Sequence, residues 1–570
     1  MKVVIIGAVA AGPKAASRLK RLVPDADITL VDQDELISYG GCGIPYFVGG
    51  DVSDEKELRS TSFHMVRDPY FFQEAKGVTT RIKTRAVSID RKERLVHVED
   101  VITGEKDALS YDKLVLATGS RPNILPIPGR DLKGVYAISD LHKAVAIKND
   151  LAAGRVRSAV IIGGGAIGIE MAEGLADLWG VDTTIVEFMP QILPRIIGPD
   201  MAAMVQEHLK ERGVKVHTQE AAKEFVGGGD GRVERVVTNR REIAADLVVM
   251  AAGVRPRSEL ARDAGLLVSP QGAIIVNQHM QTSDPDIYAA GDCVEINHLV
   301  TGRKFFAPLG SLANRQGRIV ADNLAGIPSV FPGCVGSFIM KVFDVCVGST
   351  GISLETALSE GFDAVEAKCV QSDRAHFFPT QALLFLNMVV DKRSRRVLGL
   401  QGLGKMGDGL LARINAACGL IERRASVDDF STLELAYAPP FSTAVDVLNA
   451  VSNVADNLVS DRLKTVSIQD FMAWMEGRTD HPDWMALDLR HPKEAALLAE
   501  RFPGRWIAMS YDKVRGDYQA LPRGKTFILI CNAGTRSYET QCFLRSVGID
   551  SLVLPWGLNG IARLGAKWLI

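Results

Sequence analysis

The chain has 570 residues, too many for one hydrophobic core, so about three or four domains are expected. Its 47% hydrophobic and 24% charged residues are typical of a globular protein, and a net charge of -2 gives no bulk reason to expect nucleic acid or membrane binding. No apolar run approaches the roughly 18 residues that span a bilayer. The eight cysteines form no CxxC pair, so neither a disulfide framework nor a metal site is predicted. A cytoplasmic enzyme is expected.

The first predicted element is a buried strand over residues 2–6 that turns into a helix. Gly7 and Gly12 bound the turn, where glycine lets the backbone approach a pyrophosphate held at the helix N-terminus. Val9 replaces the middle glycine of the usual motif, which weakens the match. The next strand ends at Asp32, about 20 residues on, where a ribose hydroxyl needs an acceptor. An ordinary strand, turn and helix is the alternative.

The next feature is the loop over residues 38–46, Ser-Tyr-Gly-Gly-Cys-Gly-Ile-Pro-Tyr, which contains Cys42. The position five residues later is Phe47, so Cys42 has no second cysteine nearby with which to form a disulfide. Its oxidised form therefore needs an external partner, either a substrate sulfur or an oxygen in sulfenic acid. At the start of a helix its thiolate would be stabilised and nucleophilic. A small buried apolar residue is the alternative.

A second nucleotide turn follows a strand over residues 159–162, and here all three glycines are present: Gly163, Gly165 and Gly168. The next strand ends at Glu187. An acid at this position accepts from a ribose 2′-hydroxyl and repels a 2′-phosphate, so NADH is favoured over NADPH.

Two further segments identify the first nucleotide. One is Leu-Ala-Thr-Gly-Ser over residues 116–120, and the other is Thr-Ser-Asp-Pro-Asp-Ile-Tyr-Ala-Ala-Gly-Asp over residues 282–292. With the two glycine turns, their order resembles the flavoprotein disulfide reductases over about residues 1–450. The resemblance implies FAD in the first site and a nicotinamide dinucleotide in the second, with Asp292 bonded to the ribityl chain. It adds these residues to the FAD site: Thr118, Gly119, Gly291 and Asp292.

The Cys42 loop resembles the single-cysteine subgroup of that family. This subgroup contains coenzyme A disulfide reductases, NADH-dependent persulfide or polysulfide reductases, and NADH oxidases and peroxidases. The oxidases and peroxidases of this subgroup generally carry a histidine in the first glycine loop. No histidine lies between Gly7 and Arg21 here, which argues against a dedicated peroxidase. The segment over residues 434–441 resembles the coenzyme A branch. That resemblance implies that Tyr437 reaches the partner subunit's site as a hydrogen-bond donor or proton source. A core tyrosine is the alternative.

Coenzyme A carries phosphates, so its site needs cations. Three cationic residues recur at helical spacing after the first turn, and other positions match the coenzyme A branch. A solvated cationic face is the alternative. The expected substrate-side residues are Lys14, Arg18, Arg21, Ser38, Lys76 and Arg315.

The chain also departs from the coenzyme A branch. Gly41 replaces an asparagine, the pair Phe377 and Phe378 replaces two tyrosines, and Val445 replaces a lysine. Phenylalanine cannot donate a hydrogen bond or a proton. A persulfide or polysulfide would need fewer of these contacts than coenzyme A disulfide.

The last 107 residues, 464–570, resemble a rhodanese domain. The resemblance depends on Leu-Asp-Leu-Arg over residues 487–490 and on the loop from Cys531 to Arg536. Loop amides and a guanidinium would stabilise a thiolate and then a persulfide. The loop also resembles a small-phosphatase cradle, but Ile530 occupies the position of the histidine that usually precedes the cysteine. Residues 554–558 lack the usual paired glycines, and a docking domain is the alternative.

The prediction is an α/β homodimer with two Rossmann-like domains, an α+β dimerisation domain and a rhodanese-like domain. It acts as an FAD- and NADH-dependent reductase of persulfide, polysulfide or coenzyme A disulfide, with Cys42 as redox thiol and Cys531 as sulfur carrier. An oxygen-reducing NADH oxidase, a flavin-only quinone or dye reductase and a scaffold protein are the alternatives. The predicted domains are FAD-binding (1–118 and 250–320), NAD-binding (119–249), dimerisation (321–452), a linker (453–463) and rhodanese-like (464–570).

Overall fold

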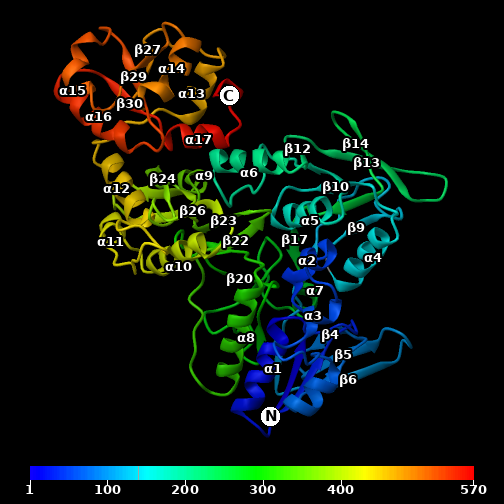
Figure 1. The fold of residues 1–570 in the computed structure, drawn as a ribbon. Helices are drawn as coiled ribbons and strands as arrows, with labels where there is room; N and C mark the ends of the chain where they lie inside the picture. The colour runs from blue at the N-terminus through cyan, green and yellow to red at the C-terminus, as the bar shows by residue number, and fades with distance from the viewer. Residues whose placement is uncertain (139, 570) are drawn as a thin grey trace. The chain divides into compact units, whose positions relative to one another are not determined.

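The computed structural model describes residues 1–138 and 140–569, which form two compact units (Figure 1). The first unit contains Met1–Pro190 and Gly213–Cys334, and the second contains Gln191–Arg212 and Val335–Ile570. Within the described ranges, no helix is long and apolar enough to cross a membrane.

The first unit contains a parallel sheet in the order β19-β7-β1-β2-β3. The central strand is buried on both faces over residues 3–6, as a strand between two helical layers requires. Two long helices, α1 (Ala11–Leu22) and α8 (Gly310–Leu324), pack against each other. The strands are β1 (Lys2–Ile6), β2 (Asp27–Val31), β3 (Thr79–Arg81), β7 (Lys113–Leu116) and β19 (Ile287–Ala289).

A second parallel sheet of this unit has the order β12-β11-β10-β16-β9. Its first connection passes through α5 (Ala166–Asp177), which follows the second glycine turn, while α4 (Leu141–Ala152) precedes β10. Each sheet therefore contains one of the two predicted nucleotide turns at the carboxyl end of a central strand. The strands are β9 (Val135–Ala137), β10 (Ser158–Ile162), β11 (Asp182–Val186), β12 (Lys215–His217) and β16 (Leu247–Met250).

Small sheets complete the first unit. Strands β8 and β17 pair where the chain passes from the first parallel sheet to the second and back again, with Arg121 opposite Arg255. The remaining elements are α2 (Ile44–Gly49), α3 (Glu55–Arg59), α7 (Glu259–Asp263), β4 (Thr84–Asp90), β5 (Leu95–Asp100), β6 (Lys106–Ser110), β8 (Ser120–Pro122), β13 (Ala222–Gly227), β14 (Val233–Thr238), β15 (Glu242–Ala244), β17 (Val254–Pro256), β18 (Ile274–Ile275), β20 (Val294–Asn297) and β21 (Lys304–Phe305).

The second unit begins with an antiparallel sheet in the order β22-β23-β26-β25-β24. Helix α10 packs on β23 and β26, and α12 packs on β24 and β25. The elements are β22 (Phe338–Val342), β23 (Val345–Gly351), β24 (Ala364–Ser372), β25 (Leu383–Asp391), β26 (Val397–Lys405), α9 (Leu354–Ser359), α10 (Asp408–Glu422), α11 (Val427–Ser431) and α12 (Val447–Val459).

The chain ends in a parallel sheet in the order β28-β27-β29-β30, covered by helices. Strand β29 is buried over residues 527–530 and leads directly to Cys531. The elements are β27 (Trp484–Asp488), β28 (Trp506–Ala508), β29 (Thr526–Ile530), β30 (Ser551–Val553), α13 (Ile468–Met475), α14 (Pro492–Arg501), α15 (Val514–Asp517), α16 (Thr535–Ser546) and α17 (Gly557–Arg563). The four main sheets confirm the predicted fold class.

The structure differs from the predicted boundaries in two places. Helix α6 (Pro199–Glu211) belongs to the second unit, although it lies inside the predicted 119–249 domain. The amide of Gly198 donates to Gln401 Oε1 at 2.7 Å, which ties the start of α6 to β26. Residues 453–459 of the predicted linker are the last turns of α12, because a stripe including Val451 and Ala455 is buried on this helix.

Candidate functional site

The first glycine turn leaves no room for side chains. Gly7 has φ +108°, and a Cβ added there would lie 2.1 Å from the carbonyl oxygen of Ala117. A Cβ on Gly12 would lie 1.9 Å from the carbonyl oxygen of Gly7, so α1 can start this close to β1 only with glycine there. Asp32 accepts from the amide of Ala8 at 2.7 Å, which fixes the acid beside the turn. The turn and acid provide the close backbone approach and ribose acceptor that FAD would need.

The other residues that are predicted to bind FAD also have defined hydrogen bonds and backbone conformations. Thr118 Oγ1 donates to the carbonyl oxygen of Arg257 at 2.5 Å, and Gly119 has φ +70°. Gly291 has φ +87°, and its amide donates to Gln316. Ser120 Oγ donates to Asp292 Oδ2 at 3.1 Å, and burial raises the pKa of Asp292. The largely buried carboxyl of Asp292 has room for a further hydrogen bond from a ligand hydroxyl.

The second turn repeats this geometry. Gly163 has φ +114°, and a Cβ on Gly168 would lie 2.0 Å from the carbonyl oxygen of Gly163. Gly165 has open space around it and forms the N-cap of α5. The carboxylate of Glu187 accepts from the amides of Gly164 and Met189, both at 2.6 Å. These residues could hold the ribose and pyrophosphate of NADH.

Cys42 lies in a short 3-10 turn, Gly41–Gly43, directly before α2. Its thiol is exposed, and its Sγ lies 3.8 Å from the position of a Cβ on Gly310, the first residue of α8. Partial burial of the thiol, and then the carboxyl groups of Glu170 and Asp292, raise the pKa of Cys42. The amides of Gly310 and Cys42 itself lower it, but by less. Burial and the two carboxylates thus raise the pKa of Cys42 more than the two amides lower it, and the stabilised thiolate expected beside an oxidised flavin stays a prediction.

Glu170 is a site residue that sequence reasoning missed. Tyr46 OH donates to Glu170 Oε1 at 3.3 Å, and burial raises the pKa of Glu170 to about 7. Helices α2 and α5 approach closely, because a Cβ on Gly49 would lie 2.8 Å from the Cα of Gly174. The only local signal is an acid two residues after Gly168, which by itself predicts nothing. A carboxyl with a pKa raised toward neutrality can hold or release a proton.

The predicted coenzyme A cations lie on or near α1 and α8. Lys14, Arg18 and Arg21 are on α1, as predicted, but Arg18 Nε pairs with Asp322 of α8 at 2.8 Å. Most of the charge of Arg18 is thus compensated within the protein. Ser38 is buried, with φ +53° and its amide bonded to the carbonyl of Ala8 at 2.7 Å.

The other two predicted cations stack on aromatic rings. Lys76 Nζ lies 5.0 Å from the centroid of Phe71, and the guanidinium of Arg315 lies 5.4 Å from that of Phe331. Both charges remain available to an anion, since a ring face does not neutralise them.

Tyr437 lies in the second unit, in an irregular segment between α11 and α12. It is 51% exposed, and Phe441 nearby in sequence is 75% exposed. The carbonyl of Pro439 accepts from the amide of Ala375 at 3.2 Å, which ties this segment to the loop that carries the exposed Phe377. An exposed apolar surface of this kind is typical of a protein interface.

Cys531 is buried at the end of β29, and the amide of Gly534 donates to its Sγ at 3.0 Å. Gly534 has φ +98° and forms the N-cap of α16, which carries the half-buried Arg536 in its first turn. One loop amide therefore contacts the sulfur, and the contact of the Arg536 guanidinium with Cys531 stays a prediction.

The first turn of α17 supports the Cys531 loop. The amide of Leu558 donates to the carbonyl of Cys531 at 2.9 Å, and the amide of Asn559 donates to the carbonyl of Asn532 at 3.1 Å. Because a trans peptide points its N–H opposite to its C=O, these bonds turn the following loop amides away from α17. Gly557 allows this contact, because a Cβ there would lie 2.2 Å from the carbonyl oxygen of Cys531.

Asp488 and Arg490, within the Leu-Asp-Leu-Arg string over residues 487–490, form a charge pair at the end of β27. Asp488 is fully buried and accepts from Arg490 at 2.7 Å and from Trp506 Nε1 at 3.2 Å. The amide of Leu489 donates to the carbonyl of Ile530 at 2.8 Å, so the pair fixes the strand next to the cysteine.

Comparison with known proteins places this geometry in context. Residues 1–308 match the family model of the pyridine nucleotide-disulphide oxidoreductases, and residues 338–448 match the dimerisation domain of the same family. A curated relative from Pyrococcus abyssi, an NAD(P)H sulfur oxidoreductase (CoA-dependent), is 37% identical over 452 residues, which are 79% of this chain and 97% of the relative.

Two solved structures match almost the whole chain. An NAD-dependent persulfide reductase from A. fulgidus has a TM-score of 0.92 at 36% identity, covering 98% of this chain and 100% of that one. A reduced CoADR-RHD from Bacillus anthracis has a TM-score of 0.89 at 30% identity, covering 99% of this chain and 98% of that one.

Proposed function

Because the chain belongs to the pyridine nucleotide-disulphide oxidoreductase family, we propose that it is an FAD- and NADH-dependent reductase of persulfide, polysulfide or coenzyme A disulfide. Cys42 is the redox thiol and Cys531 is the sulfur carrier. The observation that carries this proposal is the position of Cys42: an exposed thiol at the start of α2, beside the first residue of α8, in the unit that contains both nucleotide turns. The matches to a persulfide reductase and a sulfur oxidoreductase support it.

Different residues of the chain carry out sulfur attack and proton transfer. The Cys42 thiolate attacks the outer sulfur of a persulfide, whose S–S bond breaks to release a thiolate and leave a persulfide on Cys42. When bound, FAD supplies the two electrons, taken from NADH, that release this sulfur as sulfide. The Gly310 amide favours the thiolate of Cys42, and Glu170 holds or releases a proton at its carboxyl group, bonded to Tyr46.

Two features of the family resemblance complete the site as part of the proposal. Tyr437 donates a hydrogen bond across a homodimer, which its exposed position in the dimerisation domain allows. The cations Lys14, Arg21, Lys76 and Arg315 bind the phosphates of a coenzyme A substrate, while Arg18 orients α1 through Asp322. Glu187 selects NADH over NADPH by its charge.

Two measurements test this proposal: anaerobic NADH oxidation with coenzyme A persulfide or with coenzyme A disulfide, and NADH oxidation in air with no sulfur acceptor. Fast turnover with persulfide supports it, and it fits the replacement of two tyrosines by Phe377 and Phe378. Faster turnover with coenzyme A disulfide would narrow the substrate to that compound. Full activity with oxygen alone would identify an NADH oxidase and refute the proposal.

A further inference from the structure

A buried guanidinium is bonded to both exposed loops of the second unit. Arg413 belongs to α10 and is only 7% exposed. Its Nε lies 3.1 Å from Oδ2 of Asp446, and its Nη2 donates to the same buried carboxylate. Its Nη1 donates to the carbonyl of Gly409 at 3.0 Å, one turn earlier on α10. Arg413 thus forms a charge-assisted pair with Asp446 through two of its nitrogens and uses the third on its own helix.

The first of these loops is the Phe377 loop, residues 373–382, which connects β24 to β25. The Nη2 of Arg413 donates to the carbonyl of Asp373 at 3.2 Å. Two further bonds close the loop at its base: the amide of Asp373 donates to the carbonyl of Ala382 at 2.8 Å, and the amide of Ala382 donates to Asp373 Oδ1 at 2.9 Å. Arg413 is therefore bonded to the loop where the loop begins and ends.

The second loop is the Tyr437 segment, residues 434–446, and Asp446 extends the network to it. Asp446 forms the N-cap of α12, and its Oδ2 accepts from Ser442 Oγ at 2.8 Å. The amide of Ser442 donates to the carbonyl of Ala438 at 3.1 Å, which closes the turn directly after Tyr437. A continuous series of bonds thus runs from the guanidinium to the residue next to Tyr437.

The two loops also contact each other. The amide of Ala375 donates to the carbonyl of Pro439 at 3.2 Å. Gln371, near the end of β24, donates from Nε2 to Thr443 Oγ1 at 2.6 Å and to the carbonyl of Val445 at 2.8 Å. The loops are therefore held to each other as well as to the buried guanidinium.

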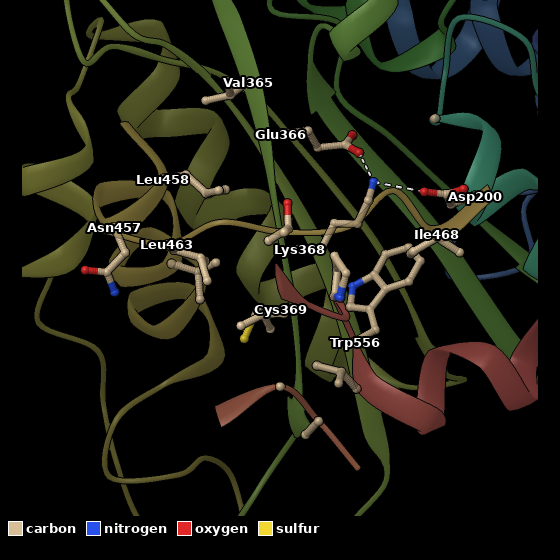
Figure 2. A pocket seen from close by; sticks show the side chains of 18 of the residues that line it. Asp200, Val365, Glu366, Lys368, Cys369, Asn457, Leu458, Leu463, Ile468 and Trp556 are labelled. Atoms are coloured by element: carbon tan, nitrogen blue, oxygen red, sulfur yellow. Dashed lines mark hydrogen bonds and ion pairs between the residues drawn. The ribbon is translucent and has the colours of Figure 1, made fainter. Parts of the chain in front are cut away.

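Apolar packing holds the Tyr437 segment only weakly. Phe441 is 75% exposed and Val445 is 56% exposed. A cavity of about 1050 Å³ lies beside Val445 and also borders residues 533–535 of the Cys531 loop. Figure 2 shows this cavity, with walls from β24 and α12. A side chain at a cavity or at the surface has few packing partners on that side, so the position of the segment depends on its hydrogen bonds.

We propose that Arg413 is a positioning residue that holds Tyr437 in place for the site of the partner subunit. The inference depends on the proposed function, in which Tyr437 donates a hydrogen bond across a homodimer. Arg413, Asp446 and both loops lie within residues 338–448, which match the dimerisation domain of the family. The guanidinium acts through the two loops and does not itself touch the substrate.

Arg413→Lys tests the role of the guanidinium fork, because it keeps the positive charge. An ammonium can pair with Asp446 but cannot also reach two carbonyl groups in the directions that the planar fork reaches. Arg395→Lys is the matched control, since Arg395 pairs with Asp428 of α11 and Asp456 of α12, each at 2.8 Å.

Arg413→Lys is expected to lower kcat with coenzyme A persulfide at least about tenfold, because a displaced Tyr437 no longer donates at the partner's site. NADH-dependent reduction of ferricyanide, which needs only the flavin, should stay unchanged. Arg395→Lys should change neither activity. An equal loss of both activities in Arg413→Lys, or full persulfide reduction, would overturn the inference.

Heterodimers purified through two different affinity tags show in which subunit Arg413 acts. In the first heterodimer, one subunit carries Cys42→Ser and the other carries Arg413→Lys, so the intact Cys42 receives Tyr437 from a subunit with native Arg413. In the second, one subunit carries both substitutions and the other is native, so the intact Cys42 receives Tyr437 from the altered subunit. Both heterodimers contain the same two substitutions, so a general loss of stability would affect them equally.

The first heterodimer is expected to have about half the persulfide reductase activity of the parent, since one of its two equivalent sites is intact. The second should be at least about tenfold less active than the first. Equal activities, or the reverse order, would overturn the inference. Tyr437→Phe in place of Arg413→Lys should give the same order. Full activity of a Tyr437→Phe homodimer would refute the proposed role of Tyr437 itself, and the inference with it.

A second pair of variants leaves the buried ion pair intact. Ser442→Ala removes the hydroxyl that donates to Asp446, and Ser452→Ala removes another buried hydroxyl, which donates to the carbonyl of Val427 at 2.6 Å. Only Ser442→Ala is expected to lower kcat with coenzyme A persulfide, by about threefold to tenfold, the effect of one hydrogen bond. The same loss in both variants, or none in Ser442→Ala, would contradict the positioning role of this network.

Discussion

The contact between Gly557 and the Cys531 loop gives a quantitative prediction. Gly557 has φ +58°, a conformation that costs a non-glycine residue about 1–2 kcal/mol. An added methyl would lie 2.2 Å from the carbonyl oxygen of Cys531, 2.6 Å from the carbonyl carbon of Asn532 and 2.7 Å from the amide of Ala533. All three atoms are backbone, so the loop must move by about 1 Å, and overpacking of this kind costs a further 1–3 kcal/mol or so. The expected destabilisation by Gly557→Ala is therefore about 2–5 kcal/mol.

Gly548→Ala is the matched control. Gly548 lies in the same C-terminal part, has φ +74°, and has nothing within 4 Å of an added Cβ. This variant should lose only the backbone cost, about 1–2 kcal/mol. The assay is the uptake of sulfur from polysulfide by Cys531, read as added mass on the cysteine peptide.

Displacement of the loop in Gly557→Ala removes the Gly534 amide bond to Sγ, so sulfur uptake by Cys531 should fall at least about tenfold. Gly548→Ala should take up sulfur like the parent. Identical behaviour of the two variants would refute the account in which α17 shapes the loop.

Three further predictions follow from the site. Glu170→Gln removes a carboxylate that raises the pKa of Cys42, so the alkylation profile of Cys42 should move to lower pH; a shift to higher pH would contradict the assigned electrostatics. Asp292→Ala should lower the FAD content of the purified protein, measured by absorbance, and unchanged content would exclude Asp292 from the cofactor site. Asp488→Asn leaves Arg490 without its buried charged partner, so the free energy of unfolding of the C-terminal part should fall by about 3–5 kcal/mol in hydrogen-exchange measurements. NADH-dependent dye reduction should persist. Equal destabilisation of both units would contradict this prediction.

Features encoded by neighbouring residues were predictable from the sequence. The turns at Gly7 and Gly163 need glycine because a side chain would strike the adjacent strand, so the requirement appears locally as a motif. The strand that carries Cys531 is a continuous apolar run, which is typical of a buried parallel strand. The order of these motifs also predicted the four sheets.

Features that depend on distant packing were not predictable. Arg18 pairs with Asp322, which is 304 positions away, so its ion pair has no local signal. The burial of Glu170 arises from the close approach of Gly49 and Gly174 on different helices. The segment over residues 456–461 suggested a linker, but the apolar stripe that is buried on the preceding residues extends α12 through Val459. The cavity beside the Cys531 loop involves residues from positions 198 to 556, which no sequence motif connects.

The central claim is that Cys42 reduces sulfane sulfur with electrons from NADH. The most direct test measures NADH consumed and sulfide released anaerobically with coenzyme A persulfide, for the parent, Cys42→Ser and the control Cys418→Ser on α10. Equal amounts of NADH consumed and sulfide released in the parent and in Cys418→Ser, with at least about a hundredfold loss in Cys42→Ser, are the predicted results. Full sulfide release by Cys42→Ser would contradict the account.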